Sequence, residues 1–354
     1  MSFIKTEREL DATELLPIAT FVHSNWHDVR AIRVLDYTPK GYFNYGVYKI
    51  IDGKGNTYAF KRHGEASIKT MEFVKEVFAH LKTMGFKNYS GFIDSSIGDP
   101  YVIDPDSVPC SLSPWISGAS IHGTDLPKED LIRVAARTLA IFHLSTSNFQ
   151  INQHTILDYK MSELWVPELV ERYKMALGEL NGKVNVFRKL NVQVPMAQLL
   201  EKVEPLIEFL SNTRTLDLME ERLARGIIHD DLDPTDLLFT HSGECYLIDF
   251  DRQRYGRRID DLEQLISNMI PINRKAHEII LEEYTRVVPL SGYEQRTLPF
   301  FVQYGTLRRT FWLINELINN QASFSERPIN VKAKLKTAIA VFDKARYPAS
   351  HVDL

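Results

Sequence analysis

The chain has 354 residues, of which 44% are hydrophobic and 25% charged, and this composition is typical of a globular protein with room for roughly two domains. The formal net charge of -4 excludes a general attraction to nucleic acid or anionic lipid, so we expect neither a nucleic acid nor a membrane as a partner. Two cysteines, Cys110 and Cys245, are too few for a disulfide framework or a zinc site. No segment approaches the ~20 apolar residues that span a bilayer, and the first residues lack the apolar core of a signal peptide. We therefore expect a cytoplasmic protein and leave its oligomeric state open.

The first third of the chain predicts a small antiparallel sheet. The segments IRVLDYTP, YGVYKIID, TYAFKRH, PYVIDPD and VPCSLSPWISG predict five strands. The turn DGKGN joins the second strand to the third, because its glycines permit positive φ. In the third strand Tyr58 and Phe60 lie on one face, whereas Lys61 lies on the other.

One helix is predicted within this sheet-forming region, between Ser67 and Thr83. Its apolar residues recur at helical spacing, at Met71, Val74, Phe78 and Leu81. Earlier, the segment Lys40–Gly46 carries two glycines between the first two strands, where a phosphate-binding loop would lie. It lacks the tight triple-glycine spacing of such a loop.

Beyond Gly118 the chain is predicted to be mostly helical. The predicted helices span 126–144, several segments of 162–224, 260–269, 274–288, 293–318 and 331–344. Breaks are expected at Gly182, Pro195 and Asn212. The predicted fold class is therefore α+β, with an N-terminal sheet-rich domain at 1–117 and a C-terminal helical domain at 118–354. Ligands usually bind in clefts at such domain junctions, so we expect the site there.

Lys61 is the first candidate site residue. A lysine in the middle of a strand, followed by a helix rich in glutamate, could reach the α- and β-phosphates of a nucleotide while a helix glutamate holds it in place. Glu72 and Glu76 lie one turn apart on the same helix face, and we favour Glu72 as this partner. The alternative for Lys61 is a solvated lysine on an exposed strand face.

A cluster of acidic residues is the second candidate. The loop HDDLDPTD, at 229–236, is followed after a turn and a strand by YLIDFD, at 246–251. So many carboxylates would repel one another unless a cation lay between them, and Mg²⁺ takes oxygen ligands while leaving room for substrate phosphates. The predicted metal ligands are Asp236, Asp249 and Asp251.

The same loop supplies the candidate catalytic residues, Asp231 and His229. Asp231 could accept or orient the proton of an attacking hydroxyl, whereas His229 is expected to brace the loop. Asp233 precedes Pro234 and is expected to form a local turn. Four arginines follow the second acidic cluster, at positions 252, 254, 257 and 258. They are interpreted either as a site for an anionic acceptor or, with more weight, as a solvated loop that offsets the acids.

The motifs HDDLDPTD and YLIDFD resemble those of the aminoglycoside phosphotransferase and choline kinase group within the protein-kinase-like superfamily. The resemblance extends to PWISG at 114–118, KEDLIRVAARTLAIFH at 128–143 and RRIDDLEQLI at 257–266, and it looks closest to the bacterial spore-coat CotS-type proteins. It implies a two-lobed kinase-like fold, in which a small sheet lobe with one helix precedes a larger helical lobe.

The resemblance also implies roles for individual residues. Lys61 would contact the nucleotide, Asp231 would be the catalytic base, and Asp249 and Asp236 would be the first and second metal ligands. The connector, with Pro114, Trp115 and Ile116, would lie under the adenine. Asp261 would brace the catalytic loop.

Two positions depart from the family pattern. Asp236 stands where the family usually has Asn, and Asp230 stands where it usually has Gly. The expected function is an ATP- and Mg²⁺-dependent phosphotransferase for a small-molecule hydroxyl or amine acceptor. The alternative, which the two departures favour, is a kinase-like structural or binding protein of spore-coat type without transferase activity. Nucleotidyl transfer remains a third possibility, because a fold does not fix a reaction.

Overall fold

The computed structural model describes residues 8–38, 46–64, 66–152, 166–182, 186–189, 191–319 and 331–344. The chain divides into two compact units: unit 1 comprises Met1–Leu157 and Asp231–Arg254, and unit 2 comprises Asp158–Asp230 and Tyr255–Leu354. The boundary expected after residue 117 falls inside unit 1. The reason is that a helix and a hairpin from beyond this position pack with the sheet-bearing region, as described below.

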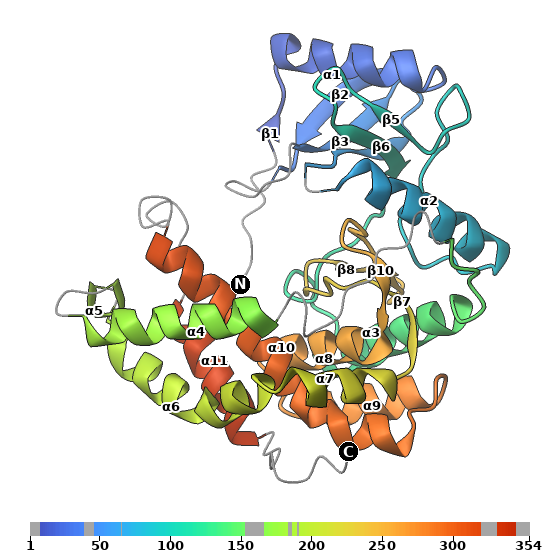
Figure 1. The fold of residues 1–354 in the computed structure, drawn as a ribbon. Helices are drawn as coiled ribbons and strands as arrows, with labels where there is room; N and C mark the ends of the chain where they lie inside the picture. The colour runs from blue at the N-terminus through green and yellow to red at the C-terminus, as the bar shows by residue number, and fades with distance from the viewer. Residues whose placement is uncertain are drawn as a thin grey trace. The chain divides into compact units, whose positions relative to one another are not determined.

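Unit 1 contains the predicted antiparallel sheet, with one strand more than expected (Figure 1). Its strands are β1 (Arg8–Glu9), β2 (Ala31–Asp36), β3 (Gly46–Asp52), β4 (Thr57–Arg62), β5 (Tyr101–Ile103) and β6 (Pro109–Pro114). They lie in the order β1-β2-β3-β4-β6-β5. Each neighbouring pair is antiparallel, which confirms the predicted sheet.

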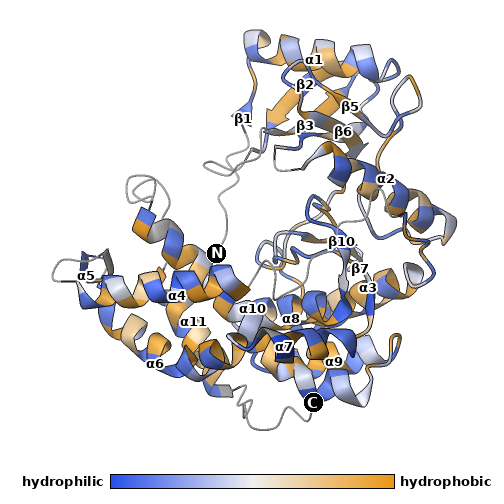
Figure 2. Ribbon diagram, in the orientation of Figure 1, coloured by the Kyte–Doolittle hydropathy of each residue, from blue (hydrophilic) through white to orange (hydrophobic). Residues whose placement is uncertain are grey.

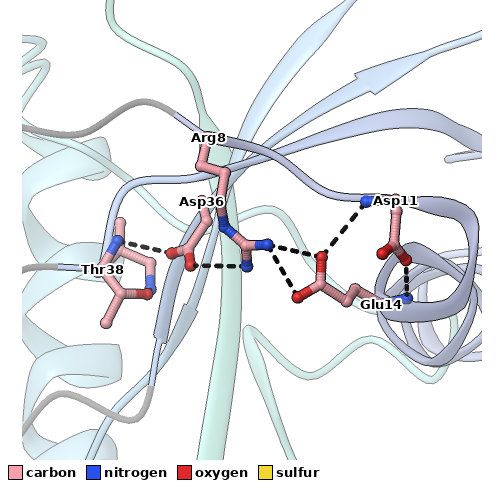
Figure 3. Close-up of polar contacts among 6 residues, drawn as sticks. Arg8, Asp11, Glu14, Asp36 and Thr38 are labelled. Atoms are coloured by element: carbon pink, nitrogen blue, oxygen red, sulfur yellow. Dashed lines mark hydrogen bonds and ion pairs between the residues drawn. The ribbon is translucent and has the colours of Figure 1, made fainter.

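Helix α1 (Ala12–Asn25) was not predicted from the sequence. It begins with a capping box, because Asp11 accepts from the Glu14 backbone N–H and Glu14 accepts from that of Asp11. Arg8 then joins the Glu14 carboxylate to that of Asp36 on β2, which ties the helix start to the sheet edge (Figure 3).

The core of the sheet lies on the face that α1 contacts. Val22 of α1 and Trp26, which follows the helix, pack in one cluster with Ile50 and Phe60, and the strands β2 and β3 are visibly hydrophobic (Figure 2). Since side chains alternate along a strand, Lys61 projects from the opposite face. The sheet therefore presents one buried face and one face on which a polar site can be built.

Helix α2 (Ile68–Thr83) confirms the predicted helix, and all four of its predicted apolar positions are buried. Ser67 caps it by accepting from the Thr70 N–H. Phe78 of α2 contacts Phe250, with ring centroids 5.1 Å apart, and Phe142 of α3 (Lys128–Ser145) contacts Phe250 at 5.9 Å. This aromatic cluster joins the two helices to the acidic segment that contains Phe250.

The hairpin β8 (Leu237–Phe239) and β9 (Cys245–Leu247) is anchored in unit 1 by backbone hydrogen bonds. Leu247 donates to Asn88 and accepts from Ser90. Ala119 and Phe239 exchange two hydrogen bonds, and a Cβ at Gly118 would lie 2.8 Å from the Phe239 carbonyl oxygen. Glycine is therefore required where the connector passes the hairpin.

Unit 2 is mainly helical, as predicted. Its helices are α4 (Val166–Asn181), α5 (Val186–Lys189), α6 (Gln193–Leu210), α7 (Thr213–Glu221), α8 (Arg258–Met269), α9 (Ala276–Thr285), α10 (Gly292–Asn319) and α11 (Val331–Lys344). The strands β7 (Arg225–Ile228) and β10 (Arg254–Arg257) pair with each other. The expected break at Pro195 is instead the first turn of α6, where proline costs no hydrogen bond.

The interior of unit 2 contains buried acids that are paired with arginines. Arg257 forms ion pairs with Glu220 and Asp260, and Arg309 donates to both carboxylate oxygens of Glu263. In the described parts of the chain no helix combines the length and the apolar character needed to cross a membrane.

Candidate functional site

Lys61 lies on β4 opposite Ser111 of β6 and Val47 of β3. Its Nζ lies 2.6 Å from Asp249 Oδ1 and 2.8 Å from Asp251 Oδ2, and its side chain is only 14% exposed. Burial lowers the pKa of Lys61, but the charges and hydrogen bonds of the two aspartates outweigh this effect and leave the pKa raised. Lys61 is therefore a charged residue held at an acidic segment, and not a solvated surface lysine.

Glu72, the partner expected for Lys61, lies in a different network. Its Oε1 accepts a hydrogen bond from Tyr101 Oη at 2.5 Å, and its Oε2 lies 3.9 Å from Lys75 Nζ. Glu76, the other possible partner, accepts from Asn152. The prediction of a helix glutamate is corrected here: in this structure the two aspartates after β9 supply the carboxylates that neutralise Lys61.

The segment after β9 presents its two acids by means of backbone and packing constraints. Asp249 has φ +66, a left-handed conformation that turns the chain sharply after the strand. Phe250 is 4% exposed and fills the aromatic cluster between α2 and α3. Because Phe250 points into this core, Asp249 and Asp251 on either side of it are both available to Lys61.

Asp251 is more enclosed than Asp249. Its side chain is 11% exposed, and its Oδ1 lies 2.7 Å from Nδ1 of His63, which is buried. His63 Nε2 in turn lies 2.7 Å from Ser111 Oγ. Although burial opposes ionisation, His63 and Lys61 hold the pKa of Asp251 well below its usual range.

The acidic loop in unit 1 places Asp236 beside the segment after β9. The Ile248 N–H donates to the Asp236 carbonyl at 3.0 Å, and the Asp233 N–H donates to Asp236 Oδ2 at 3.1 Å. Burial raises the pKa of Asp236 well above its usual range, as do the charges of Asp249, Asp233 and Asp231. Asp236 is therefore a carboxylate in an environment that disfavours its charged form.

Asp231, the predicted base, is an accessible acid of this loop, as is Asp233. Its side chain is 51% exposed, and its Oδ2 lies 3.5 Å from Arg252 Nε. A carboxylate with this exposure can meet a substrate hydroxyl directly.

The remaining residues of the loop, His229 and Asp230, belong to unit 2. Their backbone N–H groups each donate at 2.8 Å to one oxygen of the buried Asp261 carboxylate, which confirms the predicted bracing contact of Asp261. His229 is fully buried, and a bracing role fits this position better than a catalytic one. Asp230 has φ +63, which explains why this position suits the glycine of the family pattern.

The connector at 114–116 leaves a backbone edge open. Trp115 N–H donates to Thr57 O, and in an antiparallel ladder the groups of the neighbouring residues, Pro114 C=O and Ile116 N–H, then point away from β4. On that outer edge β5 pairs only with Pro109, Cys110 and Ser111. Among the described residues nothing hydrogen-bonds to Pro114 C=O or Ile116 N–H, so an acceptor and a donor lie side by side for a ligand.

Other sequence features have different outcomes. Residues 39–45 of the glycine-bearing segment Lys40–Gly46 lie outside the described part of the chain. Of the four arginines, Arg254 and Arg257 are buried, so the interpretation of a solvated loop fails for both. His63 and Ser111 were not singled out from the sequence, because neither belongs to a motif.

The oxygen donors fit Mg²⁺ as a two-carboxylate site. No group of three acidic, histidine or cysteine side chains in the described residues is arranged to hold a metal. Mg²⁺ commonly uses one or two carboxylates, with substrate phosphates and water as its other ligands. Asp236 and Asp249, whose charges interact closely, match this donor set.

Comparison with protein families gives a match to the phosphotransferase enzyme family over residues 39–296. The chain belongs to the phosphotransferase enzyme family. This span includes Lys61, both acidic clusters and the connector, so the chain is a phosphotransferase. A comparison with curated proteins gives no match.

Solved structures confirm the kinase-like fold of this phosphotransferase. An aminoglycoside phosphotransferase from Alicyclobacillus acidocaldarius subsp. acidocaldarius DSM 446 is similar with a TM-score of 0.66 and 18% identity, covering 86% of this chain and 91% of that one. A microcompartment-associated aminopropanol kinase has a TM-score of 0.64 and 18% identity, with 93% and 97% covered. The amicoumacin kinase hAmiN, in complex with AMP-PNP, Ca²⁺ and Ami, has a TM-score of 0.63 and 15% identity, with 97% and 96% covered.

Proposed function

We propose that this phosphotransferase transfers the γ-phosphoryl group of ATP to a hydroxyl or amine of a small molecule, with Mg²⁺ as cofactor. The observation that carries the proposal is the contact of Lys61 with Asp249, which joins the lysine proposed to bind the nucleotide to the acid proposed to bind the metal, across 188 positions of sequence. Both residues come from unit 1, and both are needed at the phosphates of a nucleotide.

The connector supplies the adenine site in this proposal. Pro114 C=O can accept from the adenine amino group, and Ile116 N–H can donate to a ring nitrogen. Trp115 forms the adjoining surface: its ring centroid lies 4.9 Å from that of Tyr37, and Lys49 Nζ lies 4.8 Å above it. The base would thus continue the sheet at the edge that β5 leaves open.

The charged residues serve the phosphates and the acceptor. Asp236 and Asp249 would hold Mg²⁺, which when bound neutralises charge on the phosphates. Lys61 orients the α- and β-phosphates. Asp231 accepts a hydrogen bond from the acceptor hydroxyl or amine. It takes the proton as the acceptor oxygen or nitrogen forms a bond to the γ-phosphorus and the bond from that phosphorus to the ADP oxygen breaks.

The acceptor class is inferred from the family and from the names of similar structures. These include kinases whose names refer to aminopropanol, choline and ethanolamine, and an antibiotic-modifying enzyme in complex with ADP and spectinomycin. Each is a small molecule with hydroxyl or amine groups. A cytoplasmic location is proposed on the sequence alone.

A screen of small alcohols, amines and aminoglycosides for ATP consumption tests this function. Wild type is expected to turn over at least one class of acceptor in the presence of Mg²⁺. The variant Asp231→Asn is expected to lose about 10³-fold in kcat, because it can no longer take the proton. Turnover that persists in this variant would remove Asp231 from the role of base.

A kinase-like structural or binding protein of spore-coat type without transferase activity is the second candidate, and Asp230 and Asp236 favour it because they depart from the family pattern. Thermal-shift titration with ATP separates the two. Stabilisation that needs Mg²⁺ and is lost in Asp249→Asn supports the phosphotransferase, whereas no response to any nucleotide supports the second candidate.

A further inference from the structure

The two carboxylates that contact Lys61 differ in how firmly they are held. The Asp249 side chain is 38% exposed, and Lys61 is its basic partner in the described residues. Asp251 is 11% exposed and contacts two cationic or donor groups, Lys61 through Oδ2 and His63 through Oδ1. Asp249 can therefore exchange Lys61 for another partner, whereas Asp251 is held in place by its second contact, with His63.

His63 has a defined orientation, because both of its ring nitrogens are engaged. Nδ1 lies 2.7 Å from Asp251 and Nε2 lies 2.7 Å from Ser111 Oγ. Donation from Nδ1 to the carboxylate, together with a hydrogen bond between Nε2 and the serine hydroxyl, satisfies all of these atoms. His63 and Ser111 are both buried, so solvent cannot replace either contact cheaply.

The backbone places this chain of contacts behind Lys61. Ser111 is the cross-strand partner of Lys61 in the ladder of β4 and β6, and His63 follows Lys61 by two residues. Residues i and i+2 lie on the same face of an extended segment, so His63 and Lys61 point toward the same carboxylate. One continuous chain of side-chain contacts therefore runs from Ser111 through His63 and Asp251 to Lys61.

We propose that Asp251, oriented by His63 and Ser111, is the anchor that holds Lys61 for the nucleotide phosphates, and that Asp251 is not a metal ligand. The inference rests on the proposed function and deepens it. It gives Asp251 the task that was expected of Glu72, whose carboxylate is engaged by Tyr101 and Lys75. His63 and Ser111 are positioning residues, because they act on the nucleotide only through Asp251 and Lys61.

The anchor leaves Lys61 one donor for a phosphate even when both aspartates are bound, since an ammonium has three. When Asp249 serves the metal, a second donor is released, while Asp251 keeps the lysine in place. The metal site then consists of Asp236 and Asp249, and the lysine site consists of Asp251, His63 and Ser111.

The dissociation constant of ADP, measured in EDTA, tests the anchor apart from both metal binding and turnover. His63→Phe fills the same space but donates nothing to Asp251, and ADP binding is expected to weaken by about 10-fold. His63→Asn can still donate from its amide at the Nδ1 position and is expected to bind ADP within about three-fold of wild type. Equal binding by wild type and His63→Phe overturns the anchor.

Asp104→Asn is the matched control, because Asp104 is also a buried acid paired with a β4 residue, Arg62. It is expected to change ADP binding by less than about two-fold, although it weakens the sheet. If His63→Phe does not fold, Ser111→Ala replaces it, with an expected loss of about three-fold. An unchanged constant in a folded Ser111→Ala then overturns the role of Ser111 and His63.

A second experiment tests whether Asp251 is a metal ligand. It measures, for Asp251→Asn and for Asp249→Asn, the ratio of the ADP affinity with Mg²⁺ to that without Mg²⁺. Asp251→Asn is expected to bind ADP more weakly than wild type in EDTA, while Mg²⁺ raises its affinity by the same factor as in wild type. In Asp249→Asn we expect Mg²⁺ to leave the ADP affinity unchanged. A lost ratio in Asp251→Asn shows a metal ligand and overturns the proposal, as does a larger loss in Glu72→Gln than in Asp251→Asn. Failure of wild type to bind ADP at all overturns the proposed function itself.

Discussion

Carboxylates occupy two contrasting environments in this phosphotransferase, and the contrast is clearest between the interior of unit 2 and the acidic loop of unit 1. In unit 2 the buried acids Asp260 and Glu263 and the partly buried Glu220 are paired with arginines that the fold itself supplies. In unit 1, no lysine, arginine or histidine among the described residues pairs with Asp236, which instead lies among other acids. The contrast shows which acids complete the fold and which leave charge for a ligand to neutralise, because a buried charge is tolerated only when it is compensated.

The strongest test of this contrast is to make the same chemical change in both environments. Asp249→Asn is expected to reduce kcat/KM by about 10³-fold with little change in the free energy of unfolding, because it removes a proposed ligand for Mg²⁺. Glu263→Gln is expected to destabilise unit 2 and to retain the turnover of the folded protein, because it breaks the pair with Arg309. Steady-state kinetics and urea unfolding measure the two effects. Similar kinetic losses in both variants would contradict the division.

Arg257→Met tests the compensated side of the comparison. It leaves Glu220 and Asp260 without their cation, so the free energy of unfolding is expected to fall by about 3–5 kcal/mol. Arg133→Met is the control, since the exposed pair of Arg133 with Glu129 on α3 contributes only about 0.5 kcal/mol. A loss below 1 kcal/mol in Arg257→Met, on the order of the control, would show that the buried pairs are not what stabilises unit 2.

Asp230, at the start of the acidic loop, allows the loss of a carboxylate to be separated from the effect of backbone conformation. Asp230→Ala and Asp230→Gly both remove the carboxylate, but only glycine adopts φ +63 without steric cost. The alanine variant is expected to be about 1 kcal/mol less stable than the glycine variant, and thermal unfolding of the pair measures the difference. Equal stability would mean that this residue changes its backbone conformation.

The smallest expected effect is in Asp236→Asn, which restores the residue usual in the family. Without metal the variant is expected to unfold at a higher temperature than wild type, because burial and repulsion from Asp249, Asp233 and Asp231 no longer act on a charge. With Mg²⁺ and ADP the difference is expected to narrow, since the ligand neutralises the wild-type carboxylate. If Asp236→Asn unfolded at a lower temperature than wild type in EDTA, the claim that the charge of Asp236 is uncompensated without metal would be contradicted.

Periodicity predicted most of the fold, because the sheet and the long helices each bury one regular face. The bounds of α2 and α11 agree with the predicted helices to within one residue. Helix α1 was not predicted, although Asp11 and Glu14 form the D-x-x-E signal for a helix start. Pro17, a residue that normally argues against a helix, lies within it. Such a signal depends on a local hydrogen-bond pattern that an analysis of apolar spacing does not detect.

The site was predictable where the chemistry follows from local sequence and not where it depends on distant contacts. The acidic loop and the second acidic segment are recognisable as motifs, and Lys61 follows from its strand. The partner of Lys61 was predicted wrongly, because the residues that surround it are distant in sequence. Asp251 and His63 are 188 positions apart, and Ser111 is 48 positions from His63. Only the register of β4 with β6 and the packing of Phe250 bring these residues together.

The short length of β5 has a consequence for what this protein can recognise. β5 begins at Tyr101, opposite Ser111, so its ladder with β6 stops three residues before Pro114. In the proposed adenine site, a heterocycle that offers a donor beside an acceptor would complete this ladder as an additional strand residue would. The length of the edge strand β5 would then favour planar, purine-like molecules, and inserting residues that prolong β5 would turn the open edge into ordinary sheet.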